Sequence, residues 1–377
     1  MTASFSTVHA TAQSACGIIG QLDGVLARED LEFSLLLSGP GALEQALLPL
    51  STRFSAQRIF GCTTSGEITP GGYHENSLVC IGFHKQHFTA VSRRIDGLRS
   101  FGFQDARNLV LSAQWELRER APDADAHNSF AILLIDSTSQ AEVFVAAALG
   151  SELGNTTLIG GSAGDNWKLS RTPVLDGGRL HDDAAVLLLV HTALEFRHYN
   201  FHHYRPSSTR GVITSATPAK RLVHEINGTP AIVEYARLCG LDASAIDLEH
   251  LSLHPIIILI GDKGYARGFS ELLEDGSMRF ACAIDEGMVF RVAQPGDFVA
   301  QLEERFAALQ REIGTPQLVL AFECAARKVD VERNGLYAAV ATLFARNNVW
   351  GFSCMGEQAN AINMNNSFNC LAFSVVP

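Results

Sequence analysis

The chain contains 377 residues, of which 47% are hydrophobic, and its 29 basic residues are outnumbered by 40 acidic ones, which gives a net charge of -11. No run of basic residues could follow a phosphate backbone, so this composition excludes nucleic acid as an expected partner. The length exceeds what one hydrophobic core usually serves, and two domains are expected.

The sequence predicts a cytoplasmic protein that has no membrane as a partner. Its longest apolar runs, AAVLLLV and PIIILI, are far too short to span a bilayer, and no Lys or Arg precedes Arg28. The eight cysteines include no CxxC pair, which favours free thiols over a disulfide framework.

In chain order, short apolar segments alternate with longer segments of helical periodicity. The predicted strands cover residues 33–39, 130–136, 157–161, 183–190, 255–261, 317–322 and 367–375. The predicted helices cover residues 42–54, 141–153, 229–238 and 297–313. Asn227-Gly228 and Asp275-Gly276 are turn signals. This alternation predicts an α/β chain of the α+β layered kind, with two related halves, each a mainly β sheet flanked by helices.

Two segments, GCTTSGEITPGGYHENSLVCIGF at 61–83 and GFSCMGEQANAINMNNSFNCLAF at 351–373, align without a gap at an offset of 290 residues. A fixed offset of this kind is typical of a repeated supersecondary unit. The identical pairs are Gly61 and Gly351, Gly66 and Gly356, Glu67 and Glu357, Asn76 and Asn366, Ser77 and Ser367, Cys80 and Cys370, and Phe83 and Phe373. We predict a pseudo-two-fold internal repeat in which Cys80 and Cys370 take equivalent buried positions.

A third glycine motif, IGGSAGDNW at 159–167, follows a strand-like segment and resembles the other two. Glycines at strand ends permit a positive φ and a close backbone approach, so each motif read alone predicts a tight turn. The functional interpretation is that these loops line a ligand cavity. The residues assigned to that cavity are Gly61, Cys62, Thr63, Gly66, Gly161, Ser162, Gly164, Asp165, Gly351, Phe352, Ser353, Met355 and Gly356.

Catalysis by these motifs is a weaker interpretation. Cys62, Ser162 or Cys354 could act as a nucleophile, but no histidine stands beside them as a base. The glycine spacing also differs from the phosphate-binding patterns. We therefore expect a binding protein and not an enzyme, with acyl transfer by Cys62 or Ser162 as the enzyme alternative.

Four motifs in order resemble the FIST family of sensory proteins: GCTTSGEI, GGSAGD, EINGTPAIVEYARL, and GFSCMGEQ with the terminal NNSF strand. The resemblance covers most of the chain and implies a FIST_N domain over residues 1–196 and a FIST_C domain over residues 197–377. It also implies a role in signalling through a small ligand.

Within that family, FHHYRP at 201–206, EINGTPA at 225–231 and GFSCMGEQ at 351–358 resemble the NosP group of nitric-oxide-sensing haemoproteins. The resemblance implies a haem that binds NO and a partner histidine kinase or cyclic-di-GMP enzyme, either a diguanylate cyclase or a phosphodiesterase. This chain has Asn363 where the relatives carry a histidine, and Cys354-Met355 where they carry Thr-Tyr.

His203 is the expected ligand of the haem iron. Read as an extended strand, the segment places Tyr199, Phe201 and His203 on one face, and an imidazole among aromatic rings suits a haem iron. Arg205 could meet a propionate, and Pro206 completes the segment. His198 and His202 are expected to be ordinary histidines, with a zinc site using both and a cysteine as an alternative.

Three hypotheses therefore stand. The leading one is a cytoplasmic sensor that binds NO through haem and acts through a separate signalling protein. The second is a FIST module that binds a small polar metabolite such as an amino acid, without haem, and the third is the acyl-transfer enzyme. Glu67, Asp165 and Glu357 are expected to hold their loops rather than a ligand.

Overall fold

The computed structural model describes residues 4–11, 14–54, 58–168, 170–243, 246–247, 251, 254–261 and 263–374. The chain divides into two compact units. Unit 1 comprises Met1–Asn200, Glu303–Ile362 and Phe368–Pro377, and unit 2 comprises Phe201–Leu302 and Asn363–Ser367.

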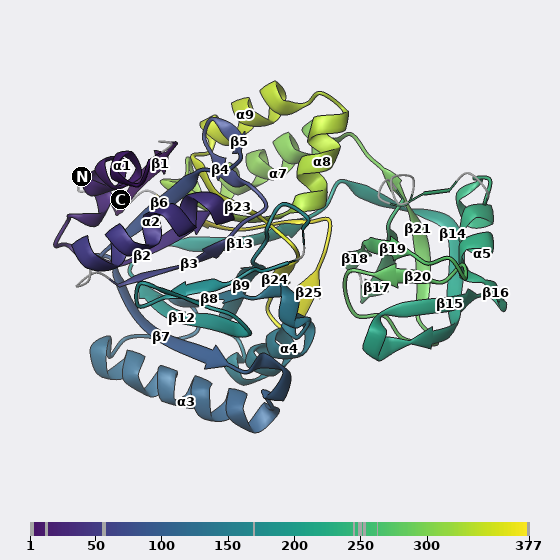
Figure 1. The fold of residues 1–377 in the computed structure, drawn as a ribbon, viewed down its shortest axis with the longest axis horizontal. Helices are drawn as coiled ribbons and strands as arrows, with labels where there is room; N and C mark the ends of the chain where they lie inside the picture. The colour runs from purple at the N-terminus through teal and green to yellow at the C-terminus, as the bar shows by residue number, and fades with distance from the viewer. Residues whose placement is uncertain are drawn as a thin grey trace. The chain divides into compact units, whose positions relative to one another are not determined.

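Unit 1 begins with an alternation of strands and helices that ends in a short hairpin and a return strand (Figure 1). We call this segment the first copy. Its elements are β1 (Phe5–Ala10), α1 (Ala15–Leu26), β2 (Leu31–Ser38), α2 (Pro40–Arg53), β3 (Ile59–Thr63), β4 (Glu67–Thr69), β5 (Gly72–His74) and β6 (Leu78–His84).

The same order of elements follows directly as a second copy. Its elements are β7 (Phe88–Asp96), the 3-10 turn Leu98–Ser100, α3 (Phe103–Arg120), β8 (Ser129–Ile135), the 3-10 turn Ser137–Ser139, α4 (Glu142–Leu153), β9 (Thr157–Ser162), β10 (Val174–Asp176), β11 (Arg179–His181) and β12 (Ala184–Thr192).

A third copy follows; Phe201–Leu302, the larger part of unit 2, begins at the end of its first strand, and the segment Asn363–Ser367 of this copy also belongs to unit 2. The elements of the third copy are β13 (Phe196–Phe201), α7 (Phe298–Ile313), β22 (Leu318–Cys324), α8 (Ala325–Arg333), α9 (Tyr337–Arg346), β23 (Val349–Cys354), β24 (Glu357–Ala359), β25 (Ile362–Met364) and β26 (Phe368–Phe373).

The three copies exchange their hairpins in a cycle. The sheet orders are β1-β6-β2-β3-β10-β11, β13-β26-β22-β23-β4-β5 and β25-β24-β9-β8-β12-β7. Each sheet thus combines four strands of one copy with the two hairpin strands of a different copy. The repeat predicted at an offset of 290 residues is confirmed, since β24 and β25 lie 290 residues after β4 and β5, and the sheets add a third member to it.

Equivalent residues in the copies share unusual backbone geometry. Each sheet contains one pair of parallel strands, and the second strand of each pair carries a glycine that faces the backbone of the first strand. Gly61 on β3 lies opposite Leu36, Gly160 on β9 opposite Leu133, and Gly351 on β23 opposite Ala321. The residue that leads into each return strand has a positive φ, at Asn76, Asp183 and Asn366 (51°, 47° and 59°). Asparagine and aspartate tolerate this conformation better than most side chains.

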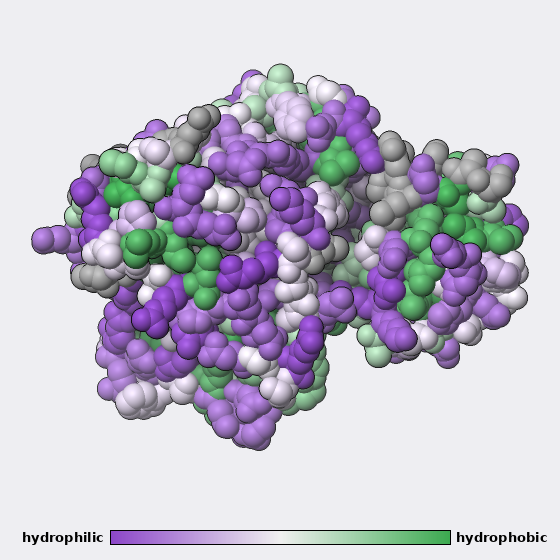
Figure 2. Space-filling model, in the orientation of Figure 1, coloured by the Kyte–Doolittle hydropathy of each residue, from purple (hydrophilic) through white to green (hydrophobic). Residues whose placement is uncertain are grey.

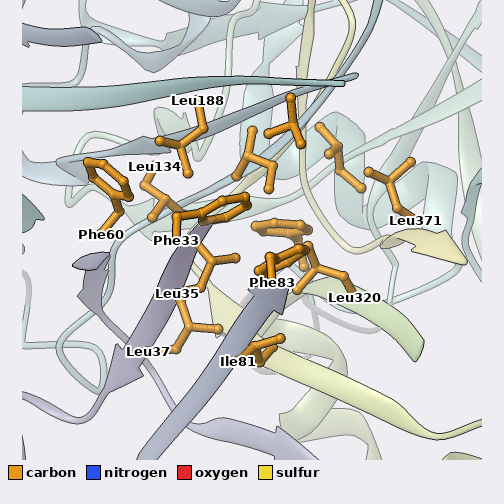
Figure 3. Close-up of a cluster of buried hydrophobic side chains, with 14 of the residues drawn as sticks. Phe33, Leu35, Leu37, Phe60, Ile81, Phe83, Leu134, Leu188, Leu320 and Leu371 are labelled. Carbon is orange, nitrogen blue, oxygen red and sulfur yellow. The ribbon is translucent and has the colours of Figure 1, made fainter. Parts of the chain in front are cut away.

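The main core of unit 1 lies between the three sheets. Phe33 and Phe83 stack with ring centroids 4.2 Å apart, and side chains of the second and third copies, such as Leu134 and Leu320, belong to the same buried cluster (Figure 3). Strands β2 and β8 are both buried along their whole length, which explains the continuous apolar run of β8.

Helices cover the other faces of the sheets. In the second copy, α3 and α4 bury a second apolar cluster against their sheet, and α1 and α2 do the same in the first copy. In α1, for example, Ile18, Leu22 and Val25 recur at helical spacing and are buried. The predicted α+β layered class is therefore confirmed.

In its described residues, unit 2 is built mainly of an antiparallel sheet, with helix α5 packed against it. The strand order is β18-β17-β21-β14-β15-β20-β19, with β16 paired to β15. The elements are β14 (Tyr204–Thr217), the 3-10 turn Pro218–Lys220, β15 (Leu222–Ile226), β16 (Thr229–Pro230), α5 (Ala231–Cys239), β17 (Ile256–Ile260), β18 (Lys263–Arg267), β19 (Phe269–Leu272), β20 (Met278–Phe280) and β21 (Val289–Pro295).

Both predicted turns of unit 2 are confirmed. Asn227-Gly228 joins β15 to β16 with positive φ at both residues, and Gly276 turns the chain between β19 and β20 with a φ of 81°. Cys80 on β6 and Cys370 on β26 are both fully buried in the second strand of their sheets, as the repeat predicts.

Among the helices of the described ranges, none is long and apolar enough to cross a membrane. Hydrophilic residues cover most of the face seen in Figure 2, with hydrophobic residues in smaller areas between them. The predicted division between residues 196 and 197 stays a prediction.

Candidate functional site

The three glycine motifs meet inside unit 1 through a ring of backbone hydrogen bonds. Ser65 N donates to Ser353 O (2.9 Å), Met355 N donates to Ser162 O (3.0 Å), and Gly164 N donates to Thr63 O (2.9 Å). Each copy thus donates to another in a closed cycle. The structure brings the three predicted loops together, although they are far apart in the sequence.

One residue from each loop lies near the middle of this ring. Ser65 Oγ is 3.4 Å from Met355 Sδ, and a Cβ on Gly164 would come within 2.2 Å of Ser65 Oγ. Gly164 therefore has no room for a side chain. The ring is a tightly packed junction, which supports the structural interpretation of these glycines.

The carboxylates of the motifs hold their own loops. Glu67 accepts hydrogen bonds from Thr64 Oγ1 and from Ser77 N and Oγ (3.1 and 2.6 Å), and burial raises its pKa while these bonds oppose the rise. Asp165 Oδ2 accepts from Ser170 N (2.7 Å) and Arg171 N (3.2 Å). This geometry supports the role expected for these two side chains.

The second copy departs from the others in one loop. Residues 64–66 join β3 to β4 in the first copy, whereas residues 163–173 join β9 to β10 in the second. Val174 lies opposite Cys62 in the same way that Glu67 lies opposite Phe352. The extra residues form a separate loop, which we call the 163–173 loop.

A cavity of about 290 Å³ lies between the 163–173 loop and the first copy. It combines the start of α2, the end of β3 and two cationic side chains. Its lining residues are Pro40, Gly41, Glu44, Thr63, Asp165, Lys168, Ser170, Arg171, Pro173 and Leu180. Thr63 and Asp165 are thus the two predicted residues that line this cavity, which we call the Thr63 cavity.

Two features of the Thr63 cavity suit an anionic group. Thr63 is 2% exposed, and its hydroxyl has no hydrogen-bond partner among the described residues. The helix α2 begins there at Pro40, and its N-cap residue Gly39 offers no side-chain acceptor to the first amide groups. A helix N-terminus attracts negative charge through these amides and the helix dipole.

The charged side chains of the cavity carry both signs. Arg171 binds Asp182 with two hydrogen bonds (2.8 and 3.0 Å), and its Nη1 lies 4.0 Å from Glu44. Lys168 and Glu44 are exposed at the cavity. Cationic and anionic groups within one small cavity match a ligand that carries both charges.

In the third copy, the place that corresponds to the Thr63 cavity is occupied by a side chain of the protein, Lys328. Helix α8 follows β22 as α2 follows β2, and Lys328 on α8 reaches Ser65 O (3.3 Å) and Glu75 Oε1 (2.5 Å). Its Nζ would lie 2.9 Å from a Cβ on Gly66. Gly66 therefore contacts a lysine of the protein.

The remaining predicted loop residues lie in the core or the ring. A Cβ on Gly161 would lie 2.8 Å from the Phe352 ring, and Cys62 and Phe352 belong to the main core. Ser353 N donates to Gly66 O, and Ser162 N donates to Gly356 O, both at 2.8 Å. Gly61 and Gly351 lie opposite β2 and β22, and Met355 lies in the ring.

The candidate nucleophiles have surroundings that do not activate them. Cys62 is fully buried, and burial raises its thiol pKa well above the usual value. Ser162 Oγ accepts a hydrogen bond from the Gln358 amide at 2.9 Å, and an amide cannot act as a base.

His203 lies outside the strand that was predicted to present it. Strand β13 ends at Phe201, and β14 begins at Tyr204, so the alternation through Tyr199, Phe201 and His203 is interrupted. The period of two holds only within a continuous strand. Tyr199 belongs to unit 1, whereas Phe201 and His203 belong to unit 2.

The imidazole of His203 is packed against two aromatic rings, which belong to Tyr204 and Phe298 and not to the predicted Tyr199 and Phe201. It lies 4.1 Å from the Tyr204 ring and 4.8 Å from the Phe298 ring, and the residue is 5% exposed. The role of His203 as a ligand of a haem iron stays a prediction. Arg205 and Pro206 are exposed on β14.

The other two histidines of the segment have protein partners. His198 Nε2 lies 2.7 Å from Asn369 Oδ1, and His202 Nε2 lies 3.1 Å from Gly264 O. The search of the described ranges found no group of three or more His, Cys, Asp or Glu residues that could hold a metal ion.

Sequence reasoning missed Lys168, Arg171 and the start of α2 as parts of a site. The signal available was the difference in loop length, since the third glycine motif is followed by extra residues before the next strand segment. That comparison requires the three copies to be aligned first.

Comparison with known families gives two matches that together cover most of the chain. Residues 33–229 match the FIST N domain, and residues 231–360 match the FIST C domain. No curated protein matches the chain. FIST domains are sensory signal-transduction modules that bind small ligands. The chain belongs to the FIST family.

Proposed function

We propose that this protein is a cytoplasmic sensor whose ligand is a small polar metabolite with a carboxylate, of the amino-acid class. The Thr63 cavity is the proposed binding site. The observation that carries the proposal concerns Thr63, which lines a cavity at the start of α2 and whose buried hydroxyl has no partner within the described part of the chain.

The cavity chemistry supports this ligand class. The α2 N-terminus, Thr63 and Lys168 would receive the carboxylate, and Glu44 would receive an ammonium group. The role is binding without turnover, because neither Cys62 nor Ser162 has an activating partner in the contacts described above. A ligand that binds the native state in preference to the unfolded chain stabilises the protein, so binding can be followed by thermal unfolding.

The test is a thermal-shift screen of amino acids and other small carboxylates, followed by calorimetry on the best ligand. Thr63→Val should weaken binding about tenfold, the loss expected for one hydrogen bond of about 1.4 kcal/mol. It should leave stability unchanged or raised, because the hydroxyl has no partner to lose.

Ser353→Ala is the matched control. Ser353 is the equivalent residue of the third copy, and its buried hydroxyl also has no partner among the residues with described placement. It does not line the Thr63 cavity. Equal affinity for Thr63→Val and the unmodified protein would contradict the proposal, as would a screen that yields no ligand.

Haem-dependent NO sensing through His203 is a second candidate. It is supported by the resemblance of FHHYRP and by the aromatic packing of a buried imidazole. Haemin titration should then give a sharp Soret band that moves with NO and is lost in His203→Ala but kept in His191→Ala. A spectrum that is the same in both variants removes His203 from the proposal.

The output is proposed to pass through a separate histidine kinase or cyclic-di-GMP enzyme, since the sequence contains no kinase or cyclase motif. The measurement is the activity of a purified candidate enzyme with the protein, in the presence and absence of ligand. An activity that does not respond to ligand argues against that partner.

A further inference from the structure

Unit 2 contains a buried arginine that has no counter-ion among the residues whose placement is described. Arg267 is the last residue of β18, opposite Ile256 of β17, and it is only 7% exposed. No carboxylate of the described residues lies within ion-pair distance of its guanidinium. A buried cation of this kind is costly unless it is paired and hydrogen-bonded.

The hydrogen bonding of this guanidinium is also incomplete. Nη1 donates to the backbone oxygen of Asn363 at 3.2 Å, and this is its one hydrogen bond within the described part of the chain. Nε is buried and has no partner there. Nε and Nη2 form the edge that binds a carboxylate or phosphate with two parallel hydrogen bonds, so the edge suited to an anion is the one left unused.

Among the described residues, the surroundings of Arg267 are polar, and no carboxylate is paired with it. The segment Asn363–Ser367 belongs to unit 2, reads NMNNS and is buried, with Asn365 and Asn366 at 3% and 2% exposure. Gly268, next to Arg267, contacts this segment, since its Cβ would lie 3.2 Å from Asn366 Nδ2. Amide groups can donate hydrogen bonds to an anion without competing for the arginine as a carboxylate would.

We infer that Arg267 and the segment Asn363–Ser367 form a binding site for a small anion that carries a carboxylate or a phosphate group. The anion accepts two hydrogen bonds from Nε and Nη2 and supplies the missing negative charge. This Arg267 site lies in unit 2 and is independent of the Thr63 cavity, which lies in unit 1.

The first test uses the full chain and thermal unfolding at constant ionic strength. Sodium chloride is replaced stepwise by sodium acetate in one series and by sodium phosphate in another. The melting temperature should rise in at least one series, and the series that responds identifies the anion as a carboxylate or a phosphate. No rise in either series would overturn the inference.

Substitutions then assign the response to Arg267. Arg267→Met should lose the anion-dependent rise and be at least as stable as the unmodified protein in chloride, because it removes a buried unpaired charge. The matched control is Arg210→Met, since Arg210 is an exposed arginine of unit 2, and it should keep the full response. A response kept by Arg267→Met would overturn the inference.

A second variant covers the case in which Arg267→Met does not fold. Arg267→Lys keeps the charge but lacks the planar fork, so it should need about tenfold more anion for the same rise. An unchanged response in Arg267→Lys would overturn the two-bond geometry. Thr63→Val should keep the response of this site, which separates it from the proposed sensing cavity.

Discussion

Glycine is required at single positions of unit 1 because the backbone of the neighbouring strand is too close for a side chain. A Cβ would lie 1.8 Å from Leu36 O at Gly61, 2.1 Å from Leu133 O at Gly160, and 1.9 Å from Ala321 O at Gly351. Real Cβ atoms do not approach a backbone oxygen so closely, so the strands would have to move apart.

We predict that Gly61→Ala lowers the free energy of unfolding by about 3 kcal/mol or more, at the upper end of overpacking costs, because the obstacle is backbone. Urea denaturation measures the change. The matched control is Gly20→Ala on α1, where nothing lies within 4 Å of the added Cβ. That change should raise stability by about 0.5–1 kcal/mol. Equal effects of the two substitutions would contradict the explanation.

Two adjacent histidine rings are expected to make unit 1 less stable in acid. The ring centroids of His9 and His74 lie 4.0 Å apart. Burial lowers the pKa of His9 from 6.5 to about 4, and repulsion from His74 is the second, smaller cause. The unfolded chain therefore binds the proton first. The stability linked to His9 is fully present above pH 6.5 and is lost as the pH falls towards 4.

His9→Gln should flatten this part of the stability profile, measured as melting temperature between pH 7 and pH 4. The glutamine amide can keep a hydrogen bond to Ser77 Oγ, which His9 Nε2 contacts at 3.0 Å. His127→Gln, at an exposed residue, is the control and should keep the slope. A slope unchanged in His9→Gln would contradict the assignment.

At the scale of elements, a buried ion pair joins β22 and α8 to the exchanged hairpin of the first copy. Glu323 and Arg327 are 0% and 1% exposed at the side chain and 2.8 Å apart, and Tyr73 on β5 donates to Glu323 Oε2 at 2.6 Å. Removing one partner leaves the other charge buried without compensation.

Arg327→Met should therefore lower the free energy of unfolding by about 3–5 kcal/mol. The double variant Glu323→Gln with Arg327→Met should cost less than the sum of the single changes, as a double-mutant cycle will show. Arg346→Met is the control, because Arg346 and Glu303 form an exposed pair 3.9 Å apart, whose loss should cost less than about 1 kcal/mol. If the double variant loses the sum of the free energies lost in the two single variants, Glu323 and Arg327 are not energetically coupled.

Elements with a strong periodic pattern could be predicted from the sequence. The predicted strands at 33–39, 130–136 and 317–322 and the helix at 297–313 match β2, β8, β22 and α7 closely. The hairpins of three-residue strands were not predicted as sheet members, because such strands carry too few residues for a period. Their pairing depends on another copy of the repeat, which no local pattern records.

The whole molecule consists of a three-copy scaffold with two departures from its symmetry. The 163–173 loop of the second copy creates the Thr63 cavity, and unit 2 enters the third copy between β13 and α7. The Thr63 cavity and Arg267 belong to these departures, whereas the segment Asn363–Ser367 of the Arg267 site belongs to the third copy. This is consistent with ligand binding by segments added to a scaffold.

This organisation predicts that unit 1 folds without most of unit 2. A chain in which a flexible linker replaces residues 202–297 keeps every strand of the three sheets of unit 1. It should retain cooperative thermal unfolding and the ligand response of the Thr63 cavity, and it should lose the anion response of Arg267. Deleting residues 88–192, the second copy, is the contrasting change and should abolish folding. Loss of cooperative unfolding in the first variant would contradict the scaffold interpretation.

The sequence alone determined the α+β layered class, the FIST membership and the repeat at an offset of 290 residues, because strand periodicity, turn glycines and motif order are local or fixed in spacing. The tertiary structure decided the rest. It revealed the second copy as a further member of the repeat, whose longer 163–173 loop breaks the sequence alignment, and it showed that most motif glycines serve strand contacts. It also brought Thr63 to Lys168 and Arg267 to the segment Asn363–Ser367, because contacts between residues distant in the chain follow from packing and leave no local pattern.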